Sequence, residues 1–227
     1  MAPLRTAIIG CGGFARRHAQ LFCEMPGQFQ LAAFCDRNPD RAAALAAGFG
    51  AGQAATYDDH HGLFAETPLD LVAICVPPYG HTDEVECAAQ LGVHVFIEKP
   101  IALSMEQAWR MVGAAEAAGI VTQVGFMFRF GAAVQHLKRL IDSGDAGPAG
   151  LMSARYFCNA LHADWWRHRE KSGGQLVEQV IHMLDLYDAI EAGRPAMTPI
   201  REGAKSLEVA LAATQSGATK TVVALPL

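Results

Sequence analysis

The sequence predicts an α/β protein that begins with a doubly wound parallel sheet and continues into a reduced α+β C-terminal domain. Through residue 126, short and nearly continuous apolar segments alternate with segments of helical periodicity. This is the pattern of parallel strands that helices cover on both faces. A glycine-rich turn, GCGGFA at residues 10–15, joins the first apolar segment to the first helical one.

Strands and helices alternate strictly in this first part of the chain. Strands are predicted where apolar residues run almost without interruption, at residues 5–9, 30–35, 69–76, 94–97 and 120–126. Helices are predicted between them, at residues 14–25, 38–48, 60–66, 81–91 and 104–118. Asn38 before Pro39 is a typical helix start, and Ser104 with Gln107 has the pattern of a capping box.

The pattern changes after residue 123. The elements expected there are a linking helix, a long strand, a helix, a final helix capped by Thr198 and a short last strand, at residues 130–143, 151–159, 174–192, 198–215 and 221–225. We therefore divide the chain into domains of residues 1–122 and 123–227. The second domain has too few strands for a stable sheet of its own, so it must pack on something else.

Composition and charge exclude several classes of partner. The 227 residues are 51% hydrophobic and 18% charged, with a formal net charge of -5. This charge favours neither nucleic acid nor an anionic membrane as partner. No apolar run is long enough to span a bilayer, and the first residues lack the layout of a signal peptide. The six cysteines form no C-x-x-C pair, so we expect reduced, structural thiols and a cytoplasmic protein.

The turn at residues 10–15 has the form G-x-G-x-x-A of a dinucleotide-binding loop. Gly10 allows the tight turn, Gly12 lets the backbone approach a pyrophosphate, and Ala15 lets helix and strand pack closely. The candidate cofactor contacts in this loop are Gly10, Cys11, Gly12, Gly13, Phe14 and Ala15. An acidic residue, Asp36, ends the second strand, where a carboxylate can accept ribose hydroxyls. The alternative is a tight turn beside an incidental aspartate, but the context favours a nicotinamide-dinucleotide-binding domain of the Rossmann type.

Asp36 also bears on the choice of cofactor. A carboxylate repels the 2′-phosphate, so Asp36 favours NAD over NADP. Its neighbour Arg37 keeps NADP open, because this side chain has three possible roles. It could stack on adenine, hold a phosphate or remain solvated.

Two further segments carry residues suited to chemistry. Glu98-Lys99-Pro100 directly follows the strand at 94–97, and ligands bind outside the carboxyl ends of such strands. Glu178, His182 and Asp185 share one face of the helix predicted at 174–192. A histidine beside a carboxylate can be a general base, although spacing alone favours a helical ion pair or a core histidine. A metal site is not expected, because the pairs His60-His61 and His162…His168 lack a convincing ligand set.

Taken together, these motifs resemble the Gfo/Idh/MocA family, the relatives of glucose–fructose oxidoreductase and inositol dehydrogenase. The resemblance extends over residues 5–193 and rests on residues 10–15, 98–100, 125–130 and 173–185. Residues 77–81 (PPYGH) look like the family's cofactor loop, although Tyr79 stands where an asparagine is more usual.

The resemblance implies hydride transfer between a carbon of a polyol or sugar substrate and the nicotinamide ring. His182 would take the hydroxyl proton, Lys99 would hold or polarise that hydroxyl, and Glu178 would stand where the family's acidic partner is commonly an aspartate. Further cofactor contacts are implied at Val76, Pro77, Pro78, His81, Glu98 and Lys99. Substrate contacts could come from four more residues, for which a structural role is an equal alternative: Arg129, His162, Trp166 and Arg167.

The chain departs from the family after residue 193. Relatives have a large, mostly antiparallel sheet in the second domain, whereas residues 191–195 lead here almost at once into residues 198–202. In relatives that sheet commonly forms an oligomer interface and lines part of the substrate pocket. Whether this chain forms a homo-oligomer is therefore left open by the sequence. Two alternatives to a working dehydrogenase also stay open. One is a nucleotide-binding sensor or scaffold without catalysis, and the other is an NAD-dependent glycosidase.

Overall fold

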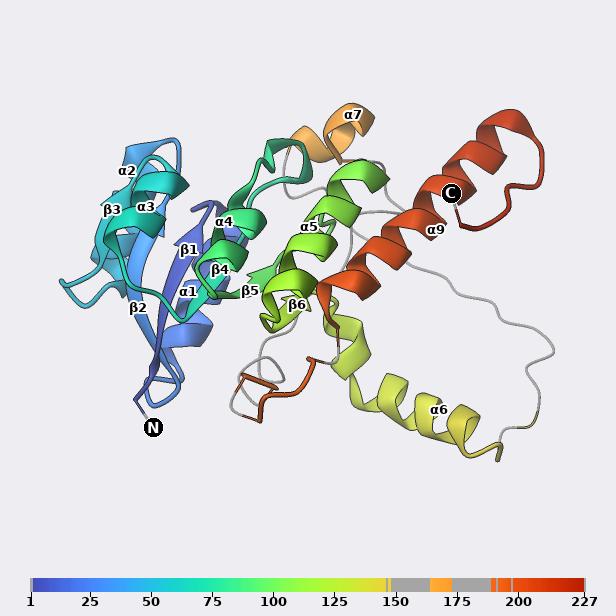
Figure 1. The fold of residues 1–227 in the computed structure, drawn as a ribbon, viewed down its shortest axis with the longest axis horizontal. Helices are drawn as coiled ribbons and strands as arrows, with labels where there is room; N and C mark the ends of the chain where they lie inside the picture. The colour runs from blue at the N-terminus through green and yellow to red at the C-terminus, as the bar shows by residue number, and fades with distance from the viewer. Residues whose placement is uncertain are drawn as a thin grey trace.

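A computed structural model describes residues 2–145, 147, 164–172, 189–190, 192–196 and 198–226. Its centre is a six-stranded parallel sheet with the strand order β3-β2-β1-β4-β5-β6 (Figure 1). The strands are β1 (Leu4–Ile9), β2 (Phe29–Cys35), β3 (Ala55–Tyr57), β4 (Leu71–Ile74), β5 (His94–Ile97) and β6 (Thr122–Val124). The order reverses between β1 and β4, which makes the sheet doubly wound and confirms the predicted fold class.

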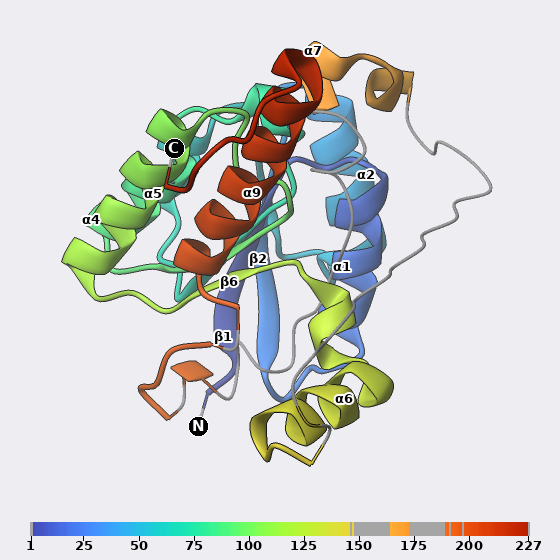
Figure 2. The same cartoon turned by 90° about the vertical axis from the view of Figure 1, so that its right-hand side faces the viewer.

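Helices cover both faces of this sheet. They are α1 (Gly13–Cys23), α2 (Pro39–Phe49), α3 (His60–Glu66), α4 (Glu84–Gln90), α5 (Met105–Ala118), α6 (Ala132–Asp142), α7 (Arg169–Ser172) and α9 (Ile200–Thr219). The described residues also form three short 3-10 helices, η1 (Pro78–Gly80), η2 (Met127–Phe130) and η3 (Asp164–Arg167). In Figure 2, α1 and α2 lie on one face of the sheet, and α4, α5 and α9 lie on the other.

Local sequence explains the starts of three helices, α2, α3 and α5. Asn38 accepts a hydrogen bond from the backbone N–H of Asp40, and Asp59 and Ser104 cap α3 and α5 in the same way. The side-chain amide of Gln107 donates to the carbonyl of His81 at 3.1 Å, so it ties α5 to the preceding loop. The short strand β3 was missed because it has only three residues at the sheet edge.

Helix α9 packs beside α5 on the first domain (Figure 1). Ile200, Ala204 and Leu207 join the same apolar core as the sheet residue Val124. A Cβ on Gly203 would lie 2.9 Å from a methyl of Val124, so the helix approaches β6 very closely. The final helix of the segment assigned to the second domain thus covers the sheet of the first.

The start of α9 differs from the prediction. Thr198 does not cap the helix, because its hydroxyl donates to the carbonyl of Val124 at 2.9 Å. The cap comes instead from β6, where the hydroxyl of Thr122 accepts the N–H of Ile200 at 2.9 Å. The helix follows Pro199, which is its N-cap residue and makes no side-chain cap.

The chain after α9 also differs from the prediction. The helix continues to Thr219, beyond the expected end near residue 215. Residues 221–225 form no strand, and the side chain of Val222 is 98% exposed, because no described strand lies beside this segment to pair with it. No helix in the described residues is both long and apolar enough to cross a membrane.

The second part of the chain is described only in pieces. The predicted linking helix is present as α6, which stands away from the sheet and exposes Val134, Leu137 and Ile141 (Figure 1). The strand expected at 151–159 and most of the helix expected at 174–192 lie outside the described residues.

Candidate functional site

The glycine loop lies at the carboxyl end of β1, pressed against the end of β4. Gly10 has a φ of +86°, a conformation that residues with a side chain rarely adopt. A Cβ on Gly10 would lie 2.8 Å from the carbonyl carbon of Cys75. Only glycine tolerates both the positive φ and the close approach of Cys75, so the turn requires glycine at this position.

The next two glycines leave open space instead. A Cβ on Gly12 or Gly13 would meet no atom within 4 Å. Gly12 is the N-cap of α1 and offers no side-chain acceptor to the first N–H groups of that helix. Uncapped N–H groups beside an open cradle are the arrangement that binds a phosphate at a helix start. Ala15, one turn further, is fully buried against the sheet, whereas Phe14 is partly exposed.

Asp36 ties the glycine loop to the end of β2. Its carboxylate accepts the N–H of Cys11 at 2.7 Å through one oxygen and the N–H of Asn38 at 2.9 Å through the other. Each carboxylate oxygen has more than one acceptor position. Asp36 can therefore hold the loop and still accept hydroxyl groups of a bound ribose.

Arg37 has a partner that the sequence did not suggest. Its guanidinium donates to the carbonyl of Gly80 at 2.9 Å. This bond joins the end of β2 to the loop that follows β4. The exposed side chain is therefore held on protein rather than freely solvated.

The thiols around the loop are chemically quiet. Burial, with the nearby charge of Asp36, raises the pKa of Cys11 to about 12. Burial, with nearby carboxylates, also raises the pKa of Cys35 to about 12. Both thiols therefore stay protonated near neutral pH and behave as small buried hydrophobes.

The loop after β4 runs through Val76, Pro77 and η1 to His81. The buried Nδ1 of His81 lies 2.9 Å from the Glu84 carboxylate. Burial alone would raise the pKa of Glu84, but hydrogen bonding and the charge of His81 lower it to about 2. Within the described residues, the buried Nε2 of His81 has no hydrogen-bond partner. An unpartnered buried nitrogen of this kind is suited to a bound polar group.

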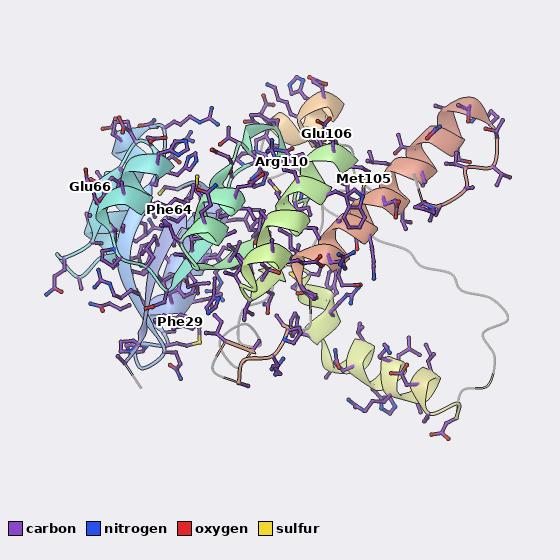
Figure 3. The ribbon with its side chains drawn as sticks, in the orientation of Figure 1. Phe29, Phe64, Glu66, Met105, Glu106 and Arg110 are labelled. Carbon is purple, nitrogen blue, oxygen red and sulfur yellow. The ribbon has the colours of Figure 1, made fainter. Side chains whose placement is uncertain are left out.

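Helix α5 holds the far side of this loop. Arg110, labelled in Figure 3, donates from α5 to the carbonyl of Thr82 at 2.7 Å. Together with the bond from Gln107 to His81, this contact holds the loop against α5. Pro78, at the start of η1, is buried beneath the loop.

Glu98 and Lys99 follow β5 at the same edge of the sheet. Lys99 is 8% exposed. The Glu98 carboxylate turns inward, and its Oε1 lies 2.7 Å from Nε2 of His18 on α1. Sequence reasoning missed this role of His18. The available signal was a histidine on the helix face that carries Ala15, Ala19 and Phe22, all of which are buried.

The segment 164–172 contacts Tyr79 in the loop at residues 77–81. The rings of Tyr79 and Trp165 lie 6.0 Å apart in an edge-to-face arrangement, and Nζ of Lys171 lies 5.9 Å from the centre of the Tyr79 ring. The ring of Tyr79 is thus contacted by side chains from η3 and α7. These contacts place the backbone of η3, which includes Trp166 and Arg167, near this loop.

The remaining predicted residues are only partly covered. Arg129 lies in η2, and its guanidinium is 3.5 Å from the Glu202 carboxylate at the start of α9. The side chains of Trp166 and Arg167 lie outside the described part of the structure, as do three whole residues, His162, Glu178 and His182.

Residues 4–126 match the family described as "Oxidoreductase family, NAD-binding Rossmann fold". The chain is 34% identical over 188 residues to D-glucoside 3-dehydrogenase of Escherichia coli K12. The aligned region covers 81% of this chain and 53% of the relative. The chain spans about half the length of the curated relatives it matches.

Solved dehydrogenase structures are also similar to this chain. The WlbA dehydrogenase of Bordetella pertussis, solved with NADH and UDP-GlcNAcA, is 29% identical with a TM-score of 0.59, over 64% of this chain and 43% of that one. The scyllo-inositol dehydrogenase of Lactobacillus casei, solved with NAD(H) and scyllo-inositol, is 26% identical with a TM-score of 0.59, over 64% and 42%.

Proposed function

This chain belongs to the Gfo/Idh/MocA oxidoreductase family, whose matched region is an NAD-binding Rossmann fold, and on that premise we propose that it is an NAD-dependent dehydrogenase of a sugar or cyclitol hydroxyl. One observation carries the proposal. The glycine loop after β1 and the buried Lys99 after β5 lie at the same carboxyl edge of one parallel sheet. That edge is where such sheets bind a nucleotide and place it against a substrate.

The residues present fit NAD. The open cradle at Gly12 and Gly13 suits a pyrophosphate, and Asp36 suits the adenosine ribose. The unpartnered nitrogen of His81 offers a further polar contact from the loop after β4. Because Asp36 carries a negative charge where NADP carries a phosphate, the proposal favours NAD.

When bound, the nicotinamide supplies the acceptor for a hydride from the carbinol carbon. The chain's own residues must then orient the substrate hydroxyl and remove its proton. Lys99 is buried, so its ammonium would stabilise the developing negative charge on the oxygen more strongly than in water. We assign the proton acceptor to His182 and the carboxylate that orients it to Glu178, by the resemblance of their segment to the family.

The substrate class rests on the named relatives, which include a D-glucoside 3-dehydrogenase and inositol 2-dehydrogenases. The contact of Tyr79 with Trp165 and Lys171 supports a substrate-facing role for the neighbouring residues, because it holds their segment at the cofactor loop. Arg129, His162, Trp166 and Arg167 remain the proposed substrate contacts.

The test combines binding with turnover. Calorimetry with NAD and then NADP measures the first step, and a panel of sugars and cyclitols followed by NADH absorbance measures the second. Lys99→Met keeps the aliphatic stem and removes the charge. We expect this variant to keep most of its NAD affinity, because the glycine loop and Asp36 are unchanged. We expect it to lose at least about a hundredfold in kcat, the scale of one electrostatic contact in a transition state.

Lys138→Met is the matched control, because Lys138 is an exposed lysine on α6 that pairs only with Asp142 among the described residues. Its activity should equal that of the wild type. NAD binding without turnover on any substrate would instead support a sensor or scaffold. Release of a sugar leaving group without net NADH would support a glycosidase. Failure to bind either nucleotide would overturn the proposal.

A further inference from the structure

Four metal-ligating side chains meet where α3 and α4 begin, away from the glycine loop. They are His60 and His61 from the first turn of α3, Asp83 at the N-cap of α4, and Cys87 one turn further along α4. One ligand atom from each lies within 4.8 Å of all the others. We propose that these four residues bind a structural Zn²⁺ ion.

One ligand atom from each residue lies within 4.8 Å of the others, and small side-chain rotations would bring these atoms to the spacing of a tetrahedral ion. Ligand bonds of about 2.0–2.3 Å place neighbouring ligand atoms roughly 3.3–3.8 Å apart. Nε2 of His61 lies 3.6 Å from Oδ1 of Asp83, and Sγ of Cys87 lies 3.8 Å from Oδ2 of the same carboxylate. Nε2 of His60 is closer to Asp83, at 2.9 Å, because the pair shares a hydrogen bond. Binding would replace that bond and requires only a small outward movement.

The donor set favours a transition metal such as Zn²⁺ over Mg²⁺ and Ca²⁺. Two imidazoles, a thiolate and a carboxylate suit Zn²⁺, whereas Mg²⁺ and Ca²⁺ prefer oxygen ligands alone. The carboxylate of Asp83 and the thiolate of Cys87 would balance the charge of the ion. Because all four ligands come from protein, the site is closed, as structural zinc sites are.

The surroundings support a built site. Asp59 caps α3 through one carboxylate oxygen, at 3.1 Å from the N–H of Gly62. Its other oxygen lies 3.8 Å from Nδ1 of His60. At 3.8 Å the two atoms share no hydrogen bond, but a small shift would let Asp59 accept from this nitrogen, as carboxylates do beside metal-bound histidines. The side chain of His61 is 57% exposed, so an ion can enter from solvent.

The consequence concerns the link between two helices. Phe64 and Glu66, labelled in Figure 3, mark α3, which lies beside α4. Both helices have only seven residues. An ion that bridges them would fix the start of α4, only two residues after His81 of the cofactor loop. Only the fold brings the four side chains together, since Asp83 and Cys87 follow the two histidines by more than twenty residues.

Zinc alone is the probe. The purified protein is stripped with chelator, loaded with Zn²⁺, desalted and analysed for metal content, and Co²⁺ loading reports geometry and thiolate ligation by absorption. We expect about one zinc per chain, a raised Tm, and a tetrahedral Co²⁺ spectrum with a thiolate band. Cys87→Ser should remove that band, and both Cys87→Ser and His60→Ala should weaken zinc binding by at least about tenfold.

Two variants on exposed residues serve as controls. Cys23→Ser removes an exposed cysteine at the end of α1, and His136→Ala removes an exposed histidine on α6. Both should bind zinc like the wild type. Undiminished zinc binding in Cys87→Ser and His60→Ala, or the absence of a stoichiometric zinc in the wild type, would overturn the proposal. NAD binding is measured separately on the zinc-free protein, so failure of one proposal does not imply failure of the other.

Discussion

Nε2 of His18 on α1 lies 2.7 Å from Oε1 of Glu98, and both residues are buried. Gly125 leaves the space that this carboxylate occupies, since a Cβ there would lie 3.0 Å from the second carboxylate oxygen. The pair joins the helix that starts at the glycine loop to the residue that precedes Lys99. It therefore links the two parts of the candidate site through the interior of the protein.

Removing His18 alone should be costly. His18→Leu keeps the apolar contacts of α1 but leaves the buried Glu98 carboxylate without its histidine partner, while the N–H of Lys99 still donates to its other oxygen at 3.2 Å. We expect a loss of about 3–5 kcal/mol in the free energy of unfolding, measured by urea denaturation. Glu98→Gln in the same chain should recover part of this loss, because a neutral amide is easier to bury. If the two substitutions were additive, the two side chains would not be coupled.

Gly10→Ala and Gly12→Ala should separate stability from binding. Alanine at Gly10 meets both the positive φ and the backbone of Cys75, so we expect a stability loss of at least about 2 kcal/mol. Alanine at Gly12 meets no protein atom within 4 Å, so its loss should stay below about 1 kcal/mol. Its methyl enters the proposed cradle instead, and NAD affinity should fall by about tenfold or more, as read by calorimetry. Unchanged NAD binding by Gly12→Ala would argue against a pyrophosphate at this position.

Asp36→Ser should change the choice between NAD and NADP. The substitution removes the charge that repels a 2′-phosphate and leaves Arg37 beside it. We expect the ratio of NADP to NAD affinity to rise by at least about tenfold, or ~1.4 kcal/mol. Loss of the bond to Cys11 N–H should also loosen the loop, so part of the effect will be weaker NAD binding. Asp40→Ser, at the start of α2, is a control that should leave the ratio unchanged.

Much of the first domain is predictable because its signals are local. The apolar segments and the caps at Asn38 and Ser104 depend on neighbours in the sequence, and the structure places elements at each of them. The start of α9 was not predictable in this way. Thr198 has the form of a cap, but the acceptor comes from Thr122, more than seventy residues earlier. Only the packing of α9 on β6 brings these two residues together.

The site divides along the same line. The glycine loop and Asp36 can be recognised from their spacing in the sequence. The structure joins them through the hydrogen bond from the N–H of Cys11 to Asp36. The partners His18 and Glu98 are eighty residues apart, and neither sequence segment indicates that the two side chains pair. The same holds for His60 and Asp83, whose bond depends on how α3 and α4 pack.

Thr122→Val tests the cap that β6 provides for α9. Valine keeps the shape of the side chain and removes the acceptor, which leaves the N–H of Ile200 buried without its partner. We expect a loss of about 1–3 kcal/mol in the free energy of unfolding. Thr122→Ser restores a hydroxyl and should recover most of this loss. If valine and serine behaved alike, the hydroxyl would not be the source of the stability.

His94 should make the folded state sensitive to mild acid. Its Nδ1 accepts the N–H of Val121 at 3.1 Å, which requires an unprotonated nitrogen. Burial lowers the pKa of His94 below its ordinary value, and the charge of nearby Asp70 offsets only part of that effect. The unfolded chain therefore binds a proton at a higher pH than the folded chain. The stabilisation is complete above about pH 6.5 and is lost as the pH falls toward the folded-state pKa.

His94→Asn isolates this contribution, because the amide oxygen of asparagine can replace Nδ1 as acceptor and does not titrate. Urea unfolding of both proteins is measured from about pH 5 to pH 8. The difference in unfolding free energy should be constant above about pH 6.5 and should shift against the wild type below it, by up to about 1.4 kcal/mol per pH unit. Other histidines titrate equally in both proteins and cancel in the difference. A difference that stays flat across this range would show that folding does not suppress protonation of His94.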